Sequence, residues 1–200
     1  MLKLNLGCGR EIKSDGWTNL DTWRKQKTID WYDTQRPLGY IIEKMDVTRP
    51  WCYDDNTVDF ITSEHMLEHI PEDKNLFALK EAYRVLKSGG TIRTIVPSRE
   101  FYESLNGLDN HPFVLKYCKD ILKRPPFGGV GSIVSRRGIY EQGHQWVPTE
   151  NMLLNQHIKA GFENVKISEY NVSEHKELSG IDLIDGLREI ESIVCEASKI

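Results

Sequence analysis

The sequence predicts an α/β protein built around one open sheet, and three observations lead to this prediction. Short segments with strand patterns alternate along the chain with segments of helical period. Polar residues or glycines follow four successive predicted strands, as expected where a ligand crevice lies outside the carboxyl ends of the strands. The chain has 200 residues, which suits one domain with one core, because chains usually divide only beyond roughly 250 residues.

The first half of the chain predicts four strands with little helix between them. Alternating or bulky apolar residues place these strands at residues 2–6, 17–20, 40–45 and 57–61. Only eleven residues separate Gly9 from Asp21, so a loop or a single helical turn must join the first two strands. Residues 22–39 are polar and aromatic without a clear period, and we expect them to be irregular.

Helices and strands alternate more regularly in the second half, with one interruption. Apolar residues at three- and four-residue spacing predict an amphipathic helix over residues 73–87, ended by the Ser-Gly-Gly at 88–90. Further strands are predicted at residues 91–96, 165–170 and 192–197, and a further helix at 149–160, capped by Thr149 and stopped by Gly161. Residues 99–147 break the alternation. We interpret them as a substrate-side insertion or lid within a single domain that spans residues 1–200.

The composition excludes several classes of protein. A net charge of −4 is too mild to predict binding to nucleic acid or to a membrane surface. A hydrophobic content of 39 % is too high for a disordered chain. No stretch approaches the roughly 18 apolar residues of a spanning helix, and the first residues lack a signal-peptide core, so we expect a cytoplasmic protein. The four cysteines contain no C-x-x-C pair, which favours free thiols.

Polar residues at the predicted strand ends indicate a ligand site. The glycines at 7 and 9 let the backbone turn sharply and approach a ligand closely. Ile12 occupies the third glycine position of the dinucleotide fingerprint, so NAD or FAD is not expected, and no P-loop motif occurs. Asp21 and Asp46 follow the second and third strands, where a carboxylate can accept hydrogen bonds from a ribose diol. A solvent-exposed turn aspartate is the other interpretation of each.

An ordered set of segments resembles one family. The segments are residues 4–9 (LNLGCG), 16–21 (GWTNLD), 46–47 (DV), 56–61 (NTVDFI), 65–70 (HMLEHI), 83–90 (YRVLKSGG) and 160–162 (AGF). Together they resemble a class I S-adenosylmethionine-dependent methyltransferase, and especially the small type 11 domains, over about residues 2–97 and 149–198. The resemblance implies a Rossmann-like sheet of seven strands with the last strand antiparallel. It also implies S-adenosylmethionine as cofactor, bound across the carboxyl edge of that sheet.

The resemblance also implies a role for each strand end. The turn at residues 7–9 faces the methionine portion of the cofactor, Asp21 faces the ribose, and Asp46 with Val47 faces the adenine. Asn5 departs from the family, because an acid commonly opens the glycine motif. The residues expected to contact the cofactor are Asn5, Gly7, Cys8, Gly9, Arg10, Asp21, Asp46, Val47, Ser63, Glu64 and His65, of which the last three flank the sulfonium end.

The implied activity is transfer of the cofactor's methyl group to an oxygen or nitrogen of a small-molecule acceptor. The cofactor already carries an activated methyl group, so the protein mainly supplies positioning and a water-poor site. An acceptor hydroxyl or ammonium must lose a proton, and His65 and His144 are the candidate catalytic bases, because imidazole titrates near neutrality. A cofactor-binding module without turnover is the alternative, favoured by Asn5 and opposed by the retained Asp21 and Asp46.

A rival chemistry lies in the same residues, because His65-x-x-Glu68-His69 matches the inverted zinc-peptidase motif. Two histidines four residues apart could chelate zinc, with Glu68 as the base. Pro71 ends any helix that begins at Ser63 after about two turns, whereas such an enzyme needs a long rigid helix. The sequence therefore predicts no metal.

The insertion carries an uneven distribution of charge. Residues 116–137 hold six basic side chains against Asp120 alone, within a chain that is acidic as a whole. One interpretation is a solvated face. The other is a site for an anionic acceptor, such as a phosphorylated or nucleotide-linked small molecule. Neither a nucleic acid nor a membrane is expected as a partner.

Overall fold

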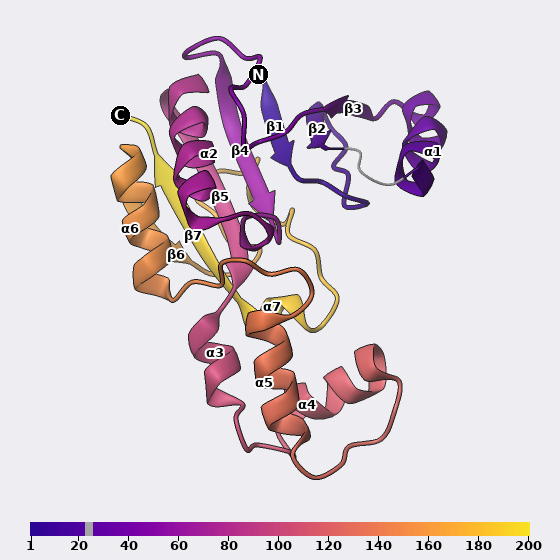
Figure 1. The fold of residues 1–200 in the computed structure, drawn as a ribbon. Helices are drawn as coiled ribbons and strands as arrows, with labels where there is room; N and C mark the ends of the chain where they lie inside the picture. The colour runs from indigo at the N-terminus through magenta and orange to yellow at the C-terminus, as the bar shows by residue number, and fades with distance from the viewer. Residues whose placement is uncertain (23–25) are drawn as a thin grey trace.

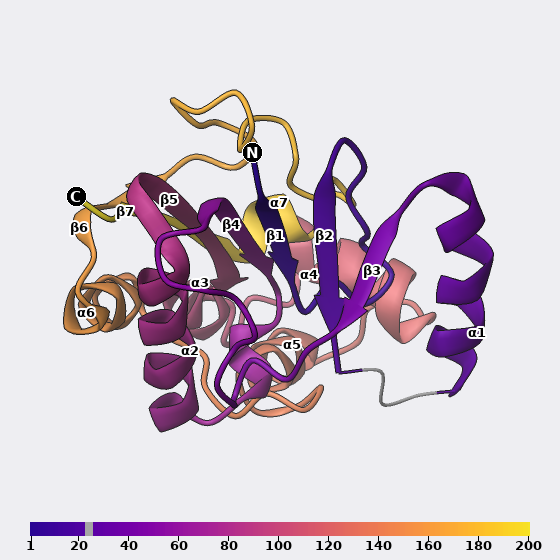
Figure 2. The ribbon, with the colours of Figure 1, turned by 90° about the horizontal axis from the view of Figure 1, so that it is seen from above.

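In the computed structural model, which describes residues 1–22 and 26–200, seven strands form one sheet (Figures 1 and 2). The strands are β1 Lys3–Leu6, β2 Trp17–Asp21, β3 Ile41–Lys44, β4 Val58–Glu64, β5 Leu86–Pro97, β6 Glu163–Ser168 and β7 Ser192–Ser198. Their order across the sheet is β3-β2-β1-β4-β5-β7-β6. Strands β1 to β5 are parallel, and β7 is antiparallel to both β5 and β6. The predicted Rossmann-like sheet is confirmed.

Two helices lie side by side on one face of the sheet, α2 Glu72–Val85 and α6 Glu150–Ala160 (Figures 1 and 2). Helix α6 begins where the hydroxyl of Thr149 accepts a hydrogen bond of 3.3 Å from the backbone N–H of Met152. It ends at Gly161, whose φ of +106° suits a residue without a Cβ. The predicted cap and stop of this helix are confirmed.

The opposite face of the sheet is crossed by the loop of residues 169–187 (Figure 2). Arg93 on β5 is fully buried beneath this loop. Its guanidinium donates hydrogen bonds of 2.5 and 2.9 Å to the carboxylate of Asp182 and one of 2.6 Å to Glu196 on β7. It also donates to the backbone carbonyls of Glu169 and Val172. One buried side chain therefore joins the loop to two strands.

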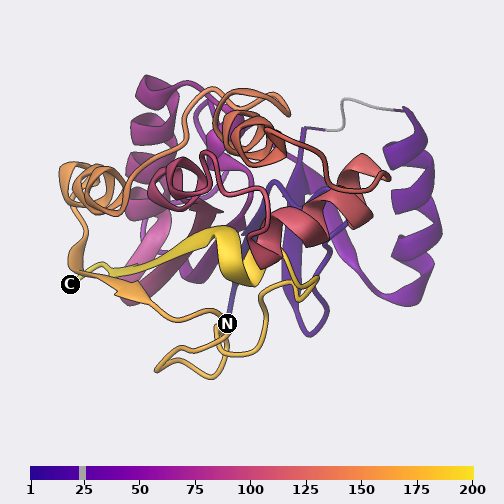
Figure 3. The ribbon, with the colours of Figure 1, turned by 90° about the horizontal axis from the view of Figure 1, so that it is seen from below.

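The insertion is helical and lies beyond the carboxyl ends of the parallel strands (Figures 1 and 3). Its elements are α3 Arg99–Ser104, α4 Pro112–Tyr117, a π-helical turn Cys118–Leu122 and α5 Val130–Tyr140. Tyr102, Phe113 and Val134 belong to a separate apolar cluster that holds these helices together. Leu187, just before the short helix α7 Arg188–Glu191, joins the same cluster. The insertion thus lies over the edge of the sheet at which the residues predicted to bind a ligand are found.

The prediction that residues 22–39 are irregular is wrong for most of that segment. Helix α1 Gln26–Gln35 and a 3-10 turn Arg36–Leu38 occupy it, beyond the β3 edge of the sheet (Figure 2), while residues 23–25 lie outside the described residues. Most residues of α1 are polar and Tyr32 is its one buried residue, so few apolar positions mark the helix in the sequence.

Two predicted boundaries also differ from the structure. Strand β4 runs on to Glu64, so no helix begins at Ser63, and the chain instead forms a 3-10 turn at Leu67–His69 before Pro71. Helix α2 stops at Val85 because β5 begins at Leu86, which pairs with Val58 across a register shift. The Ser-Gly-Gly at 88–90 therefore lies in a strand and does not end the helix.

Two expectations from composition concern the cysteines and membrane-spanning helices. All four cysteines are free, as predicted, although Cys52 is exposed while the other three are buried. No helix within residues 1–22 and 26–200 is both long enough and apolar enough to cross a membrane.

Candidate active site

The turn after β1 is built by its glycines and by Asn5. Gly7 and Gly9 have φ values of +63° and +49°, and a Cβ on Gly7 would lie 2.1 Å from Cγ of Met66. Asn5 is buried, and its amide donates hydrogen bonds of 2.9 Å to the Glu11 carbonyl and to Oδ1 of Asn19. The buried side chain of Asn5 therefore fixes the turn by hydrogen bonds. The methyltransferases that the sequence resembles commonly have an acid at this position.

Asp21 and Asp46 both stand at the carboxyl ends of their strands, as predicted. Oδ2 of Asp21 accepts a hydrogen bond of 2.7 Å from the hydroxyl of Tyr32, and Oδ1 accepts one from the backbone N–H of Thr22. Oδ1 of Asp46 accepts hydrogen bonds from the backbone N–H and the hydroxyl of Thr48, at 3.0 and 2.7 Å. Each carboxylate is therefore held in a fixed direction by its neighbours.

The strand ends enclose a cavity of about 170 Å³, which we call the strand-end cavity. It is lined by Gly7, Asp21, Thr22, Met45, Asp46, Val47, Thr48, His65, Met66, His69 and Ile70. Five of these residues were predicted to contact the cofactor. The others surround them in the chain or lie in the turn after β4, so their place at the cavity follows from the strand ends.

The remaining residues that were predicted to contact the cofactor do not line this cavity. Glu64 is buried and accepts hydrogen bonds from the hydroxyl of Tyr170 and the backbone N–H of Leu183, at 2.8 and 3.0 Å, so it faces the 169–187 loop. Ser63 is buried, and its hydroxyl has no hydrogen-bond partner within the described part of the chain. Because successive residues of a strand point to opposite faces, neighbours such as these two cannot share one surface.

The residues of the glycine turn and the residue after it, Cys8, Gly9 and Arg10, differ in exposure and in their contacts. The Cys8 side chain is buried beside Tyr32, with Sγ 3.6 Å from the phenol oxygen, and burial raises the pKa of this thiol to about 12. Gly9 contributes its carbonyl as an acceptor for the Tyr32 hydroxyl at 2.6 Å. Arg10 is exposed and stacks over the ring of Trp31 at 5.5 Å.

His65 lies where β4 leaves the sheet. Its φ of +48° is uncommon for a residue with a side chain, and its backbone N–H donates to the carbonyl of Ile95 on β5. Nε2 lies 2.8 Å from the hydroxyl of Ser192, and Nδ1 lies 3.3 Å from Oε1 of Glu68. Burial opposes protonation of this imidazole, but the adjacent carboxylate of Glu68 outweighs burial and raises the pKa of His65.

A second cavity, of about 260 Å³, lies between the sheet edge and the insertion, and we call it the insertion-side cavity. Its walls are His65, Glu68, His69, Tyr102, Tyr117, Ile121, Gln142, His144, Asp185, Leu187, Arg188 and Glu191. It shares His65 and His69 with the strand-end cavity. Both predicted catalytic histidines, His65 and His144, line it. The sequence could indicate the place of His65, which follows a strand, but not the contacts of His144.

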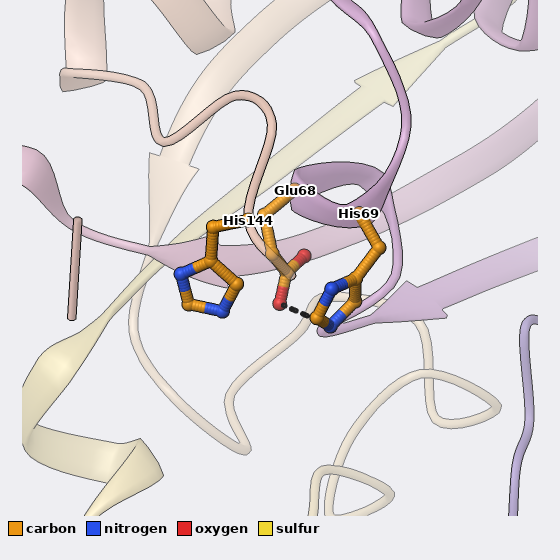
Figure 4. A group of neighbouring side chains, drawn as sticks. All are labelled: Glu68, His69 and His144. Atoms are coloured by element: carbon orange, nitrogen blue, oxygen red, sulfur yellow. Dashed lines mark ion pairs between the residues drawn. The ribbon is translucent and has the colours of Figure 1, made fainter. Parts of the chain in front are cut away.

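His144 reaches this cavity through backbone pairing that no local pattern reveals. The carbonyl of Glu68 accepts hydrogen bonds from the backbone N–H groups of Gln145 and Trp146, at 2.6 and 3.2 Å. The His144 ring then lies 5.1 Å from the ring of His69, centroid to centroid. Burial lowers the pKa of His144, which favours the neutral imidazole. Figure 4 shows Glu68 between the two histidines.

The basic side chains of residues 116–137 lie elsewhere. Lys119, Lys123 and Arg124 line a separate shallow cavity with Pro125 and Pro126. The others form ion pairs, namely Lys116 with Asp120 at 2.7 Å, and Arg136 and Arg137 with Glu141 at 3.2 and 3.5 Å, the last through a buried Nε atom. None of the six is among the residues that line the insertion-side cavity.

Comparison with known proteins agrees with this architecture. Residues 4–94 match a family model described as a methyltransferase domain. A SAM-dependent methyltransferase from Archaeoglobus fulgidus has 17 % sequence identity and a TM-score of 0.60 over 99 % of this chain and 86 % of that one. An S-adenosylmethionine-dependent methyltransferase from Mesorhizobium loti has 15 % identity and a TM-score of 0.57, covering 98 % and 90 %. No match is found among curated proteins.

A larger protein shares the same fold. The structure of PigF with SAH has 15 % identity and a TM-score of 0.57 over 99 % of this chain, which spans 50 % of the PigF chain. At these identities the likeness concerns the fold. The chain therefore has the fold of class I S-adenosylmethionine-dependent methyltransferases, and its residues 4–94 match a methyltransferase domain.

Proposed function

We propose that this protein transfers a methyl group from S-adenosylmethionine, bound in the strand-end cavity, to a hydroxyl or amine of a small molecule in the insertion-side cavity. The observation that carries the proposal is that the two cavities share His65 and His69. A donor in one cavity and an acceptor in the other would meet at these two residues. In-line approach of the acceptor to the methyl carbon is the main requirement of this reaction.

The strand-end cavity offers the groups that the cofactor needs. The Asp21 carboxylate is the proposed acceptor for the ribose hydroxyls, since an ionised carboxylate can accept several hydrogen bonds. Asp46 and Val47 are the proposed contacts for the adenine, and the turn at Gly7 is the proposed place for the methionine portion. Asn5, Cys8 and Gly9 are proposed to shape the turn around these contacts, which their hydrogen bonds within the protein support. Contacts of Arg10, Ser63 and Glu64 with the cofactor stay predictions.

The insertion-side cavity offers a place for the acceptor's proton. Nδ1 of His144 lies 2.7 Å from the carbonyl of Gly138, so this nitrogen is the natural donor and Nε2 keeps its lone pair. A neutral imidazole of this kind can take up a proton or hold a cation. His65 has partners on both ring nitrogens, Ser192 and Glu68, and we propose that it positions the junction of the two cavities.

The charge of the cavity bears on the acceptor. Glu68, Asp185 and Glu191 line it together with the single arginine Arg188, which lies 3.7 Å from both Glu64 and Asp185. In the absence of a bound cation, this balance favours an uncharged or cationic acceptor over an anionic one. The phosphorylated or nucleotide-linked acceptor stays a prediction that rests on the basic side chains of residues 116–137. We further propose that the insertion selects the acceptor, because substrate choice commonly resides in segments over a rigid sheet edge.

Calorimetric titration with S-adenosylmethionine and with S-adenosylhomocysteine tests the first part of this proposal. We expect one site per chain and, at a hundred times the dissociation constant, a stabilisation of roughly 2.7 kcal/mol. Labelled cofactor offered with amines, phenols and phosphorylated compounds then tests the second part. No heat and an unmoved melting curve at millimolar cofactor would contradict the proposal. Binding without methylation of any acceptor class would favour the alternative, a cofactor-binding module without turnover.

A further inference from the structure

We propose that Glu68, His69 and His144 bind a divalent transition-metal ion at the boundary of the two cavities. One potential ligand atom from each residue lies within 4.8 Å of the other two. Figure 4 shows the Glu68 carboxylate between the two imidazole rings, with all three side chains directed toward one another. The separations exceed those of a bound site, so closure onto an ion requires a small movement of the side chains.

The Glu68 carboxylate is the strongest indication of a missing partner. Its side chain is fully buried, and neither oxygen has a hydrogen-bond partner within the described part of the chain. Oε1 has ion-pair contacts with Nδ1 of His65 at 3.3 Å and Nε2 of His69 at 3.9 Å, whereas Oε2 has neither a hydrogen-bond nor an ion-pair partner among the described residues. Burying a carboxylate without hydrogen bonds is costly, and such groups in proteins are paired or coordinate metals.

Both histidines are oriented as metal ligands usually are. Nδ1 of His144 lies 2.7 Å from the carbonyl of Gly138, and Nδ1 of His69 lies 3.3 Å from the carbonyl of Gly143. A ring that donates through Nδ1 carries its lone pair on Nε2, and metal-binding histidines commonly make such a bond to a carbonyl. Nε2 of His69 faces Oε1 of Glu68 at 3.9 Å. The lone pairs are thus available for an ion beside the carboxylate.

The backbone holds these ligands in place independently of any ion. The Glu68 carbonyl accepts from the N–H groups of Gln145 and Trp146, and the Gln145 side-chain amide donates to the His69 carbonyl at 2.6 Å. These bonds join the 3-10 turn Leu67–His69 to the end of the insertion, although the two segments are far apart in sequence. A site assembled on such a frame loses little entropy when it binds an ion.

The cluster differs from the zinc motif in the sequence. That motif pairs His65 with His69 on one helix, but the structure places Nε2 of His65 on the Ser192 hydroxyl and has no helix there. His144 takes the place of His65 in the group that converges. The prediction of no metal rested on the missing helix, and a site that draws its third ligand from the insertion does not need one.

Two imidazoles and one carboxylate favour Zn²⁺ or a similar ion over Mg²⁺, which prefers oxygen ligands. Three protein ligands leave a coordination position open, and all three residues line the insertion-side cavity. When the ion is bound, His144 is a ligand and does not act as the base, so a hydroxyl at the open position would lose its proton to bulk water near neutral pH. Its oxygen would then form a bond to the methyl carbon while the carbon–sulfur bond breaks and the sulfonium becomes a thioether. This chemical role rests on the proposed function, whereas binding of the ion does not.

The experiment uses the full chain, stripped with a chelator and titrated with Zn²⁺ alone and then with Mg²⁺ alone. We expect one Zn²⁺ per chain, a raised melting temperature with Zn²⁺, and no effect of Mg²⁺. Glu68→Gln, His69→Ala and His144→Ala should each weaken Zn²⁺ binding by at least about a hundredfold, since loss of a group that merely supports a ligand already costs about 10- to 100-fold. His175→Ala is the matched control, because this histidine contacts Thr91 in the middle of β5 and lines neither of the two cavities.

The outcomes separate this inference from the proposed function. The His69 side chain is 43 % exposed, so His69→Ala should fold, and its Zn²⁺ affinity can be measured directly without cofactor present. Stripped protein that takes up no stoichiometric Zn²⁺, or uptake that survives in both His69→Ala and His144→Ala, overturns the metal site. Zn²⁺ binding without any binding of S-adenosylmethionine overturns the proposed function and retains the metal site. Cofactor binding without Zn²⁺ binding does the reverse.

Discussion

The phenol oxygen of Tyr32 lies 2.7 Å from Oδ2 of Asp21 and 2.6 Å from the carbonyl of Gly9, so one hydroxyl proton serves two acceptors. Burial raises the pKa of Tyr32, which keeps that proton on the phenol. Helix α1 thus ties the glycine turn to the acid at the end of β2. The direction of the Asp21 carboxylate is set before any ligand arrives.

Replacement of this acid gives the first prediction. We expect Asp21→Ala to weaken S-adenosylmethionine binding by about ten- to a hundredfold, because hydrogen bonds to a charged group contribute roughly 1.5 to 3 kcal/mol. Calorimetry measures the affinity, and circular dichroism checks that the variant is folded. Asp54→Ala, at an exposed turn, should bind the cofactor as the parent does. Equal affinity in the two variants would show that Asp21 is a turn residue only.

Charge reversal in the insertion tests the nature of the acceptor. Arg136 and Arg137 pair with Glu141 and do not line the insertion-side cavity. We therefore expect the double variant with both arginines changed to Glu to leave the acceptor's Michaelis constant within about twofold, at low salt as well as high. Kinetics at two ionic strengths decide the matter. A steep rise in that constant at low salt would instead support the anionic acceptor that the composition of residues 116–137 suggests.

A buried histidine predicts acid sensitivity of the fold. His157 on α6 is fully buried between the Leu153 carbonyl and the Thr94 hydroxyl, and burial lowers its pKa from 6.5 to about 4. Between these values the unfolded chain binds a proton that the folded chain does not, so the free energy of unfolding falls as the pH falls. The expected loss from pH 7 to pH 4.5 is about 2 to 3 kcal/mol.

Urea unfolding at the two pH values measures this loss. In His157→Gln the loss should be smaller, since no imidazole remains to be protonated in the unfolded chain. His175→Gln, which changes a half-buried histidine, should keep the parent's dependence on pH. An identical loss in the parent and in His157→Gln would assign the acid sensitivity to other groups.

The Arg93 network predicts unequal effects of two similar substitutions. Asp182→Asn removes one of the two carboxylates that pair with the buried guanidinium of Arg93. It should lower the free energy of unfolding by about 3 to 5 kcal/mol. Asp120→Asn breaks a surface pair with Lys116 whose side chains are more than a third exposed, and should cost less than about 1 kcal/mol. Denaturant titrations of both variants measure the difference. Similar values would mean that the buried network contributes no more than a surface pair.

The sequence indicates the strands well because each alternates or carries bulky residues, and it misses α1 because Tyr32 gives that helix too small a buried face. At the site, Asp21 and Asp46 lie at one edge because parallel strands end there. Glu64 does not line the strand-end cavity because its carboxylate faces the 169–187 loop, and its contact with the cofactor stays a prediction. The partners of His144 depend on hydrogen bonds between remote segments, which no local spacing encodes.

Strand β7 lies between β5 and β6, which has a consequence for the order in which the sheet is assembled. During synthesis β6 leaves the ribosome before β7, yet its partner in the sheet is β7. Until then the nascent β6 is an edge without a neighbour, open to association with other chains. Glu163 and Lys166 place charges along it, and charged edges discourage such association. Because β6 remains at the edge of the finished sheet, these charges oppose association with other chains both before and after β7 is added.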